Sequence, residues 1–267
     1  AKQALERANL EPEDIDIIVC ATTTPDQIMP STGALIQAQL GAVNAAGMDV
    51  FAACSGFLYG ITMVESMIRT GQIKYALVVG AEVLTKYVDY TDRGTCVIFG
   101  DGAGAAVLGP VPAGKGILAT KIKSDGRYEE QLYAPGGGTK LGTTHKTIDD
   151  RLHFFKMKGN ELFKVAVRSM ADISAEMLKK AGLTVDDVDI VIPHQANQRI
   201  TDAVASRLGV PEEKVYSNIE FHGNTSSASI PIAIDECIES GRIKEGSTVL
   251  LTAFGGGVTW GATIVQF

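Results

Sequence analysis

A cysteine at the junction between a strand and a helix could act as a nucleophile. Cys54 follows the short apolar segment Asp49–Ala53 and precedes a helical pattern that starts at Ser55. A thiol in this position faces unpaired backbone N–H groups and the positive end of the helix dipole, and both favour the thiolate. A buried structural cysteine is the alternative interpretation. The remaining cysteines lie within strand or helix patterns and are expected to be structural: Cys20, Cys96 and Cys237.

Two further polar residues stand directly beside apolar elements. His194 follows the segment Asp189–Pro193, which has the length of a buried strand. Ligand sites of α/β proteins gather at the carboxyl ends of strands, so this position predicts a functional histidine. Asn224 precedes a helical pattern in His222-Gly223-Asn224 and is either a helix N-cap or an amide donor in a site. His222 could be a turn residue.

Two glycine clusters could approach a ligand closely. Gly100–Gly104 resembles part of a dinucleotide-binding fingerprint, but the following residues to Leu108 form a short strand pattern rather than a helix. The interpretation of the chain as a nucleotide-dependent oxidoreductase would depend on this motif alone. Gly255–Gly257 follows an apolar strand pattern, and its successive N–H groups could form half of an oxyanion hole.

Strand and helix patterns alternate along the chain, which predicts an α/β fold. Residues 110–155 are rich in glycine, proline, lysine and threonine, and they predict a strand followed by a long excursion loop. The expected strands span residues 15–21, 49–53, 75–80, 96–99, 103–108, 189–193, 248–254 and 259–267. The expected helices span 31–40, 55–69, 158–180, 198–208 and 226–240.

The sequence contains two copies of one unit at an offset of about 170 residues. Asn224 lies 170 residues after Cys54, so the repeat predicts that these two residues are counterparts. We expect one half at 1–156 and the other at 157–267, with a site where they meet. The matching segments are Asp14–Val19 with Asp187–Ile192, Leu40-Gly41 with Leu208-Gly209, and Gly71 with Gly241.

Composition excludes several classes of protein. The 267 residues are 45% hydrophobic, which is typical of a folded globular chain. No apolar run approaches the roughly 18 residues of a membrane span. The four cysteines contain no CxxC pair, which predicts a reducing, cytoplasmic location. The net charge of −7 argues against general nucleic-acid binding.

Taken together, the motifs resemble the thiolase superfamily, and within it the 3-oxoacyl-[acyl-carrier-protein] synthase III family, the initiating condensing enzymes of bacterial type II fatty-acid synthesis. This resemblance implies a thiolase-like α/β fold, with duplicated mixed-sheet halves in a layered α-β-α-β-α arrangement. It also implies a homodimer. The matching segments are Ala52–Phe57, Asp92–Thr95, Phe99–Ala105, Met157–Asn160, His194–Asn197, His222–Ser226 and Phe254–Gly261.

The resemblance implies roles for the candidate residues. Cys54 would take a primer acyl group from acyl-coenzyme A, with the oxyanion held by the N–H groups of Cys54 and Gly256. His194 and Asn224 would bind the thioester carbonyl of malonyl-acyl carrier protein while CO₂ is lost. No metal or redox cofactor is implied. The implied contacts are Arg93 for coenzyme A, Lys164, Arg199 and Arg207 for acyl carrier protein, and Met29 (across the dimer) and Phe99 for the acyl pocket.

The sequence also departs from the family pattern. The family has a further βα segment before the residue that is Ala1 here, and that segment contributes to the coenzyme-A adenine site. Two interpretations of its absence from this sequence stay open: the sequence is a shortened form of a longer chain, or the protein has weakened coenzyme-A binding. The loop 128–155 is longer than usual beside the expected pocket. The alternatives are a secondary-metabolism condensing enzyme with the same Cys-His-Asn set, or a catalytically impaired relative that binds acyl-coenzyme A or acyl carrier protein.

Overall fold

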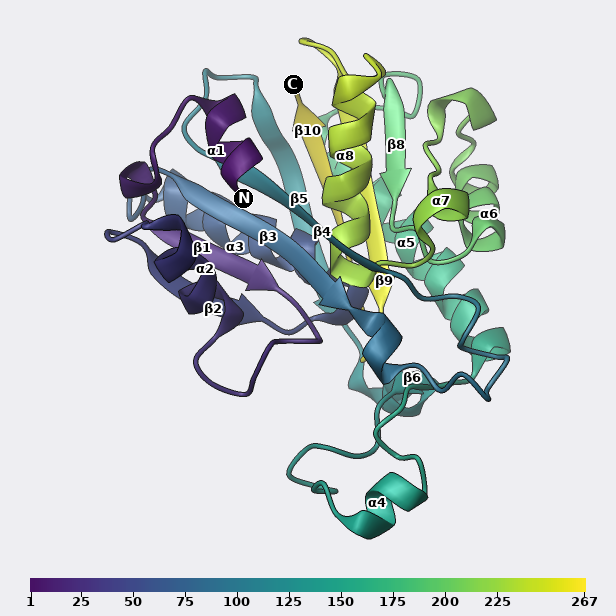
Figure 1. Cartoon of the computed structure of the whole chain (residues 1–267). Coiled ribbons are helices and arrows are strands. Elements are labelled where there is room, and N and C mark those ends of the chain that lie inside the picture. The colour runs from purple at the N-terminus through teal and green to yellow at the C-terminus, as the bar shows by residue number, and fades with distance from the viewer.

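The computed structural model describes all residues from 1 to 267 and contains two four-stranded sheets covered by helices (Figure 1). In the first sheet, the order is β2-β1-β3-β4, with β4 antiparallel to β3 and the other neighbours parallel. In the second, the order is β5-β10-β9-β8, and only β8 and β9 are parallel. The strands are β1 (Ile17–Ala21), β2 (Ala46–Val50), β3 (Ala76–Val83), β4 (Asp101–Leu108), β5 (Gly116–Ser124), β8 (Ile190–Pro193), β9 (Thr248–Gly255) and β10 (Thr259–Gln266).

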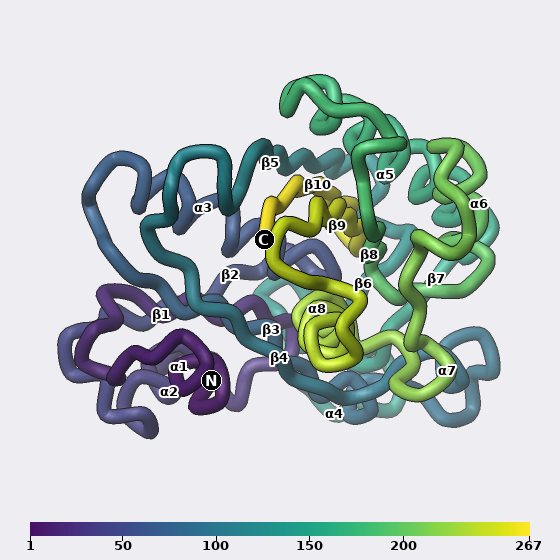
Figure 2. Tube along the Cα trace, turned by 90° about the horizontal axis from the view of Figure 1, so that it is seen from above, coloured from purple at the N-terminus to yellow at the C-terminus, as the bar shows by residue number.

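Two helices form a layer between the sheets. They are α3 (Gly56–Arg69) and α8 (Ser229–Glu239), and the view from above shows α8 in the middle of the molecule (Figure 2). One hydrophobic cluster joins their side chains, such as Phe57 and Ile230, to residues of both sheets, such as Val19 and Leu251. Because these helices are apolar on the faces toward both sheets, the sheets stack across them rather than against each other.

Further helices cover the outer faces and complete five layers. On the first sheet, α1 (Lys2–Ala8) and α2 (Thr32–Leu40) enclose a cluster around Ile18 and Leu77. On the second sheet, α5 (Gly159–Ala181) and α6 (Gln198–Leu208) enclose the clusters that include Ile173 and Val204. The α-β-α-β-α expectation is confirmed. None of the helices combines the length and hydropathy that a membrane crossing needs.

An excursion between β5 and α5 projects from the body (Figure 1), as the sequence predicted. The ion pair between Arg151 and Asp89 anchors it, together with stacking of Phe155 on Tyr87. The short elements of the excursion are η4 (Gly126–Gln131), β6 (Leu132–Tyr133), α4 (His145–Asp149) and β7 (Lys156–Met157). β5 belongs to the second sheet, although it precedes the expected boundary between residues 156 and 157.

Some predicted elements differ from the structure. The strand expected at 96–99 is wrong, because residues 96–98 form turns and Phe99 forms only an isolated bridge with Asn224, whose N–H donates to the Ile98 carbonyl. The strand expected at 49–53 is β2, which ends at Val50. The last long helix starts at Ser229 after a 3-10 turn, η6 (Ser226–Ala228), rather than at Ser226.

The structure also corrects the alignment of the two copies. The 3-10 turn η2 (Ala53–Ser55) leads into α3 as η6 leads into α8, and their first residues are 173 apart. Ala53 and Ser226 both have a positive φ, 46° and 50°, which supports this pairing. Cys54 therefore corresponds to Ser227 rather than to Asn224, because the copies differ in length between their matched segments.

Candidate active site

Cys54 lies in η2, where the backbone leaves the first sheet and enters α3, and it is 6% exposed. The end of β9 lies directly against it, since a Cβ on Gly255 would come within 2.6 Å of the Cys54 nitrogen. The β9–β10 hairpin also holds the η2 turn. Ser55 donates a hydrogen bond to the Thr259 carbonyl at 3.1 Å, and Thr259 donates one to the Ala52 carbonyl at 2.8 Å. Gly255, the last residue of β9, thus places its backbone beside the cysteine amide.

The thiol of Cys54 does not have the lowered pKa that its position at a helix start predicts. Burial raises its pKa to about 12, and the negative charge of Glu82 adds to this effect. The Ser226 side chain favours the ionised form but only partly offsets the loss of hydration. Burial therefore outweighs the helix-start effects that favour the thiolate, and it favours the neutral thiol.

His194 is held at the end of β8 in one orientation. It is 1% exposed, and its backbone N–H donates to the Thr252 carbonyl at 2.7 Å. Its Nδ1 lies 2.7 Å from Ser229 Oγ, which also accepts a hydrogen bond from the Gln195 N–H at 3.4 Å. Nδ1 is the only acceptor within the chain for the Ser229 hydroxyl hydrogen, which favours donation from Ser229 to Nδ1 and a ring proton on Nε2.

The Nε2 atom of His194 is buried and has no partner within the chain. Burial lowers the pKa of His194 to about 3, so the imidazole is neutral at physiological pH. A buried polar group without a partner costs stability, which is typical of a functional site rather than of a structural one. His194 can therefore present a neutral N–H donor to a ligand.

Asn224 is fixed through both its backbone and its side chain. Its N–H donates to the Ile98 carbonyl, and its carbonyl accepts from the Gly100 N–H, each at 2.9 Å. Its Oδ1 accepts from the Ser226 N–H at 2.8 Å, at the start of η6. Asn224 is not a helix N-cap, because the N-cap of η6 is Thr225, although Asn224 Oδ1 does bind the first N–H of that turn. Its Nδ2 amide makes no hydrogen bond within the chain and is available as a donor.

The turn from Asn224 to Ser229 brings the three candidate residues together. η6 packs against η2, which carries Cys54. Ser226 joins Asn224 to the thiol, while Ser229 positions His194. Sequence reasoning missed both serines. The run of hydroxyl residues directly after Asn224 was the available signal.

The expected acyl-pocket and coenzyme-A residues lie apart from one another. Phe99 is next to the Asn224 backbone, and its ring centroid is 5.6 Å from that of Phe155. Met29 is 78% exposed on the loop after β1, so nothing in this chain brings it to the thiol. Arg93 is exposed in a turn and forms no ion pair. No group of three or more His, Cys, Asp or Glu residues is placed to hold a metal ion.

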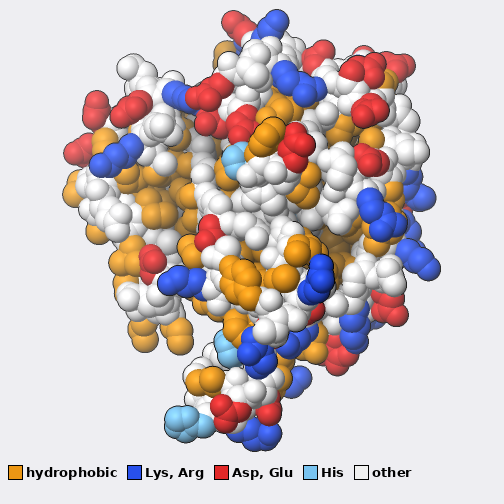
Figure 3. Space-filling view, turned by 45° about the vertical axis from the view of Figure 1, so that its right-hand side comes forward, with side chains coloured by type: hydrophobic (Ala, Val, Ile, Leu, Met, Phe, Trp, Pro, Cys, Tyr) orange, Lys and Arg blue, Asp and Glu red, His pale blue; other side chains and the backbone are white.

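The three expected carrier-protein contacts are all exposed on α5 and α6. Arg199 lies over the Phe163 ring at 5.6 Å, so Lys164, the next residue on α5, lies near the start of α6. Arg207 is eight residues further along α6, about 12 Å away, where it pairs with Asp172 at 3.1 Å. Lysine and arginine side chains gather along the right and lower parts of the face in Figure 3.

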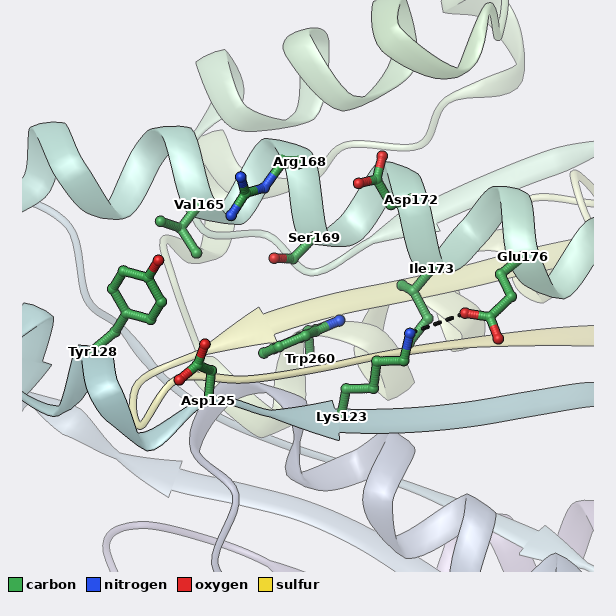
Figure 4. Close-up of a pocket in the computed structure, with 10 residues that line it drawn as sticks. All are labelled: Lys123, Asp125, Tyr128, Val165, Arg168, Ser169, Asp172, Ile173, Glu176 and Trp260. Atoms are coloured by element: carbon green, nitrogen blue, oxygen red, sulfur yellow. Dashed lines mark hydrogen bonds and ion pairs between the residues drawn. The ribbon is translucent and has the colours of Figure 1, made fainter.

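A cavity of about 270 Å³ lies between α5, β5 and β10 (Figure 4). Trp260 forms its floor, and Arg168 faces it from α5. None of the three candidate residues lines this cavity. It is a separate feature on the outer side of the second sheet.

Comparisons with known proteins place these features in one family. Two family models match, 3-oxoacyl-[acyl-carrier-protein (ACP)] synthase III over residues 48–126 and its C-terminal model over 178–267. The chain is 49% identical to beta-ketoacyl-[acyl-carrier-protein] synthase III of Clostridioides difficile and 47% identical to that of Caldanaerobacter subterraneus. Both matches cover 100% of this chain and 81% of the relative. The crystal structure of 3-oxoacyl-[acyl-carrier-protein] synthase III from Aquifex aeolicus is 48% identical, with a TM-score of 0.92 over 100% of this chain and 82% of that one.

Proposed function

The chain belongs to the 3-oxoacyl-[acyl-carrier-protein] synthase III family, the condensing enzymes that initiate fatty-acid synthesis, and we propose that Cys54, His194 and Asn224 carry its two chemical steps. One observation carries this assignment. The Nε2 of His194 and the Nδ2 of Asn224 are two neutral donors, each held by its other polar atom and left without a partner in the chain. Asn224 and Ser229, the partner of His194, flank the turn whose Ser226 side chain contacts the Cys54 thiol.

In the first step, the sulfur of Cys54 attacks the carbonyl carbon of an acyl-coenzyme A. The oxygen gains negative charge and would accept hydrogen bonds from the N–H groups of Cys54 and Gly256, a role supported by the close approach of the neighbouring Gly255 to the Cys54 nitrogen. The carbon–sulfur bond to coenzyme A then breaks. The proton of the neutral Cys54 thiol ends on the coenzyme A sulfur, so a raised thiol pKa is compatible with this exchange.

In the second step, malonyl-acyl carrier protein loses CO₂. The electrons of the broken carbon–carbon bond move into the thioester carbonyl, whose oxygen accepts hydrogen bonds from His194 and Asn224. A histidine with a pKa of about 3 suits this role, since it donates from Nε2 without adding a buried positive charge. The carbanion attacks the acyl group on Cys54, and the released Cys54 sulfur regains a proton, giving 3-oxoacyl-acyl carrier protein.

This chemistry uses acyl-coenzyme A and malonyl-acyl carrier protein as substrates and requires no metal or redox cofactor. Carrier protein would dock on the exposed bases of α5 and α6, where Lys164 and Arg199 are best placed because Asp172 neutralises Arg207. Arg93 would bind coenzyme A, and Phe99 would line the acyl pocket.

A cytoplasmic homodimer is the proposed assembly. Several large hydrophobic side chains are exposed in this chain, and a second copy would cover them. Met29 belongs to this set and would reach the neighbour's acyl pocket. The others with more than three-quarters of their surface exposed are Ile28, Phe51, Val97 and Phe221.

Incubation with acetyl- and isobutyryl-coenzyme A, followed by intact mass measurement, tests the assignment. The parent protein and Asn224→Ala should gain one acyl group, and Cys54→Ala should gain none. Asn224→Ala should then fail to convert malonyl-acyl carrier protein. Cys96→Ala, at a partly exposed cysteine outside the site, serves as the control and should behave like the parent.

Two results would contradict the proposal. Acylation of Cys54→Ala would place the nucleophile elsewhere. A folded parent protein that gains no acyl group would instead favour a binding relative without catalytic activity.

A further inference from the structure

The carboxylate of Glu236 on α8 forms hydrogen bonds with three residues of the segment that leads to Asn224. The Oε2 of Glu236 accepts a hydrogen bond from the Tyr216 hydroxyl at 2.8 Å and another from the Asn218 amide at 2.6 Å. Its Oε1 lies 2.7 Å from the Nε2 of His222, which stands two residues before Asn224. One side chain therefore holds three donors from the seven residues between Tyr216 and His222, in which α7 (Ile219–His222) lies beside α8 (Figure 1).

The same segment is also tied to the neighbour of His194. Gln195 is 1% exposed, and its Oε1 accepts a hydrogen bond from the Asn218 N–H at 3.1 Å. Its Nε2 donates to the carbonyls of Pro193 and Tyr216, at 2.7 and 3.3 Å. Movement of Asn218 would consequently disturb both the loop before Asn224 and the residue after His194.

Helix α8 joins these contacts into one support. Ser229, which holds His194, is seven residues before Glu236, so the two side chains lie on the same face of the helix two turns apart. Helix α8 thus supports both donors of the proposed condensation step, His194 through Ser229 and Asn224 through Glu236. Cys54 is carried by η2 and is not among the residues bonded to Glu236.

The chemistry of this position requires a carboxylate. Burial raises the pKa of Glu236, but the hydrogen bonds from Asn218, His222 and Tyr216 outweigh it and leave the pKa below its usual value. An ionised carboxylate only accepts hydrogen bonds and has room for all three donors. A glutamine amide would keep one acceptor oxygen and turn an NH₂ group toward some of the same donors.

We propose that Glu236, with His222, is a positioning residue for condensation that holds Asn224 and the surroundings of His194 without taking part in acylation of Cys54. This inference rests on the proposed function, in which only the second step uses Asn224. A small displacement of a catalytic group can cost about 100-fold in rate.

The test compares two rates in the whole 267-residue chain. The first is acylation of Cys54 by acetyl-coenzyme A, followed by intact mass. The second is conversion of malonyl-acyl carrier protein by enzyme that has already been acylated. In Glu236→Gln, condensation should fall about 10- to 100-fold while acylation stays within about twofold of the parent. The matched control is Glu239→Gln, the same change on the same helix at a side chain that is 62% exposed and pairs only with Arg7.

A second variant keeps the test decisive if Glu236→Gln does not fold. His222→Ala removes one donor from a side chain that is already 37% exposed, and it should lower condensation several-fold with acylation unchanged. Parallel loss of both steps, or unchanged condensation in the folded variants, would overturn the inference. If Asn224→Ala itself does not separate the two steps, the proposed function fails instead.

Discussion

Replacing Ser229 with alanine removes the contact that selects the tautomer of His194. Ser229 is 2% exposed and His194 is 1% exposed, and the hydrogen bond between Ser229 Oγ and His194 Nδ1 is 2.7 Å long. Without it, Nδ1 is left buried with no partner, which should lower the free energy of unfolding by about 1–3 kcal/mol. The ring is also free to move its proton from Nε2 to Nδ1.

The expected effect on condensation follows from that proton. Loss of one donor to a developing oxyanion typically costs about 100- to 1,000-fold in rate. Ser229→Ala removes the preference for the correct tautomer rather than the donor itself, so the expected decrease is smaller, about 10- to 100-fold. This range corresponds to roughly 1.4–2.7 kcal/mol of activation free energy. Acylation of Cys54 does not use His194 Nε2 in this mechanism and should change little.

Rapid-quench measurements on acylated enzyme mixed with malonyl-acyl carrier protein give the condensation rate directly. Ser174→Ala is the matched control, because Ser174 is fully buried and its hydroxyl has no hydrogen-bond partner. That variant should condense at the parent rate. If Ser229→Ala also keeps the parent rate, or loses acylation to the same extent, the tautomer argument is refuted.

Two more predictions concern pH and backbone approach. The pKa of His194 is about 3 in the folded chain against 6.5 in a model peptide, so unfolding takes up a proton below pH 6.5. This contribution to stability is therefore lost as pH falls from about 6.5 toward 3, by up to about 1.4 kcal/mol per pH unit. Denaturant titrations should show a shallower acid loss in His194→Gln than in the parent or in His145→Gln, and equal slopes would contradict the argument. Gly255→Ala should slow acylation about 100-fold, because its Cβ would lie 2.6 Å from the Cys54 nitrogen. Gly126→Ala, where nothing lies within 4 Å, should acylate normally, and a parent-like rate in both would show that the approach of β9 is unimportant.

Residue types and positions predicted an α/β fold and singled out the three candidate residues, whereas the five layers were implied by the family resemblance. His194 follows a strand, as the flanking apolar pattern indicated, whereas Asn224 precedes a 3-10 turn rather than the helix that the pattern predicted. The prediction of a strand at 96–99 was wrong because an apolar run does not show whether its backbone pairs within a sheet or with a loop such as the one at Asn224. The roles of Ser226 and Ser229 depend on side-chain contacts across a turn, which leave no periodic signal in the sequence.

The ionisation of Cys54 could not be predicted for a different reason. Its local sequence favours a thiolate, because the thiol stands at the start of a helix. The burial that reverses this preference comes partly from Gly255, which is about 200 residues away in the chain and approaches only because the two halves pack together. A pKa set by desolvation depends on tertiary packing, so a single motif cannot supply it.

The two copies of the unit have therefore diverged at one shared position. Ala53 and Ser226 keep the same positive φ at the start of facing 3-10 turns, and the next residues are Cys54 in one copy and Ser227 in the other. Ser227 has a structural role, with its hydroxyl 2.8 Å from the Ala21 carbonyl and 2.9 Å from a Glu82 oxygen. In this arrangement the first copy supplies the nucleophile, and the second supplies both condensation donors and their support. Neither half alone contains the proposed site, so its integrity depends on the contact between η2 and η6 as much as on the three reacting side chains.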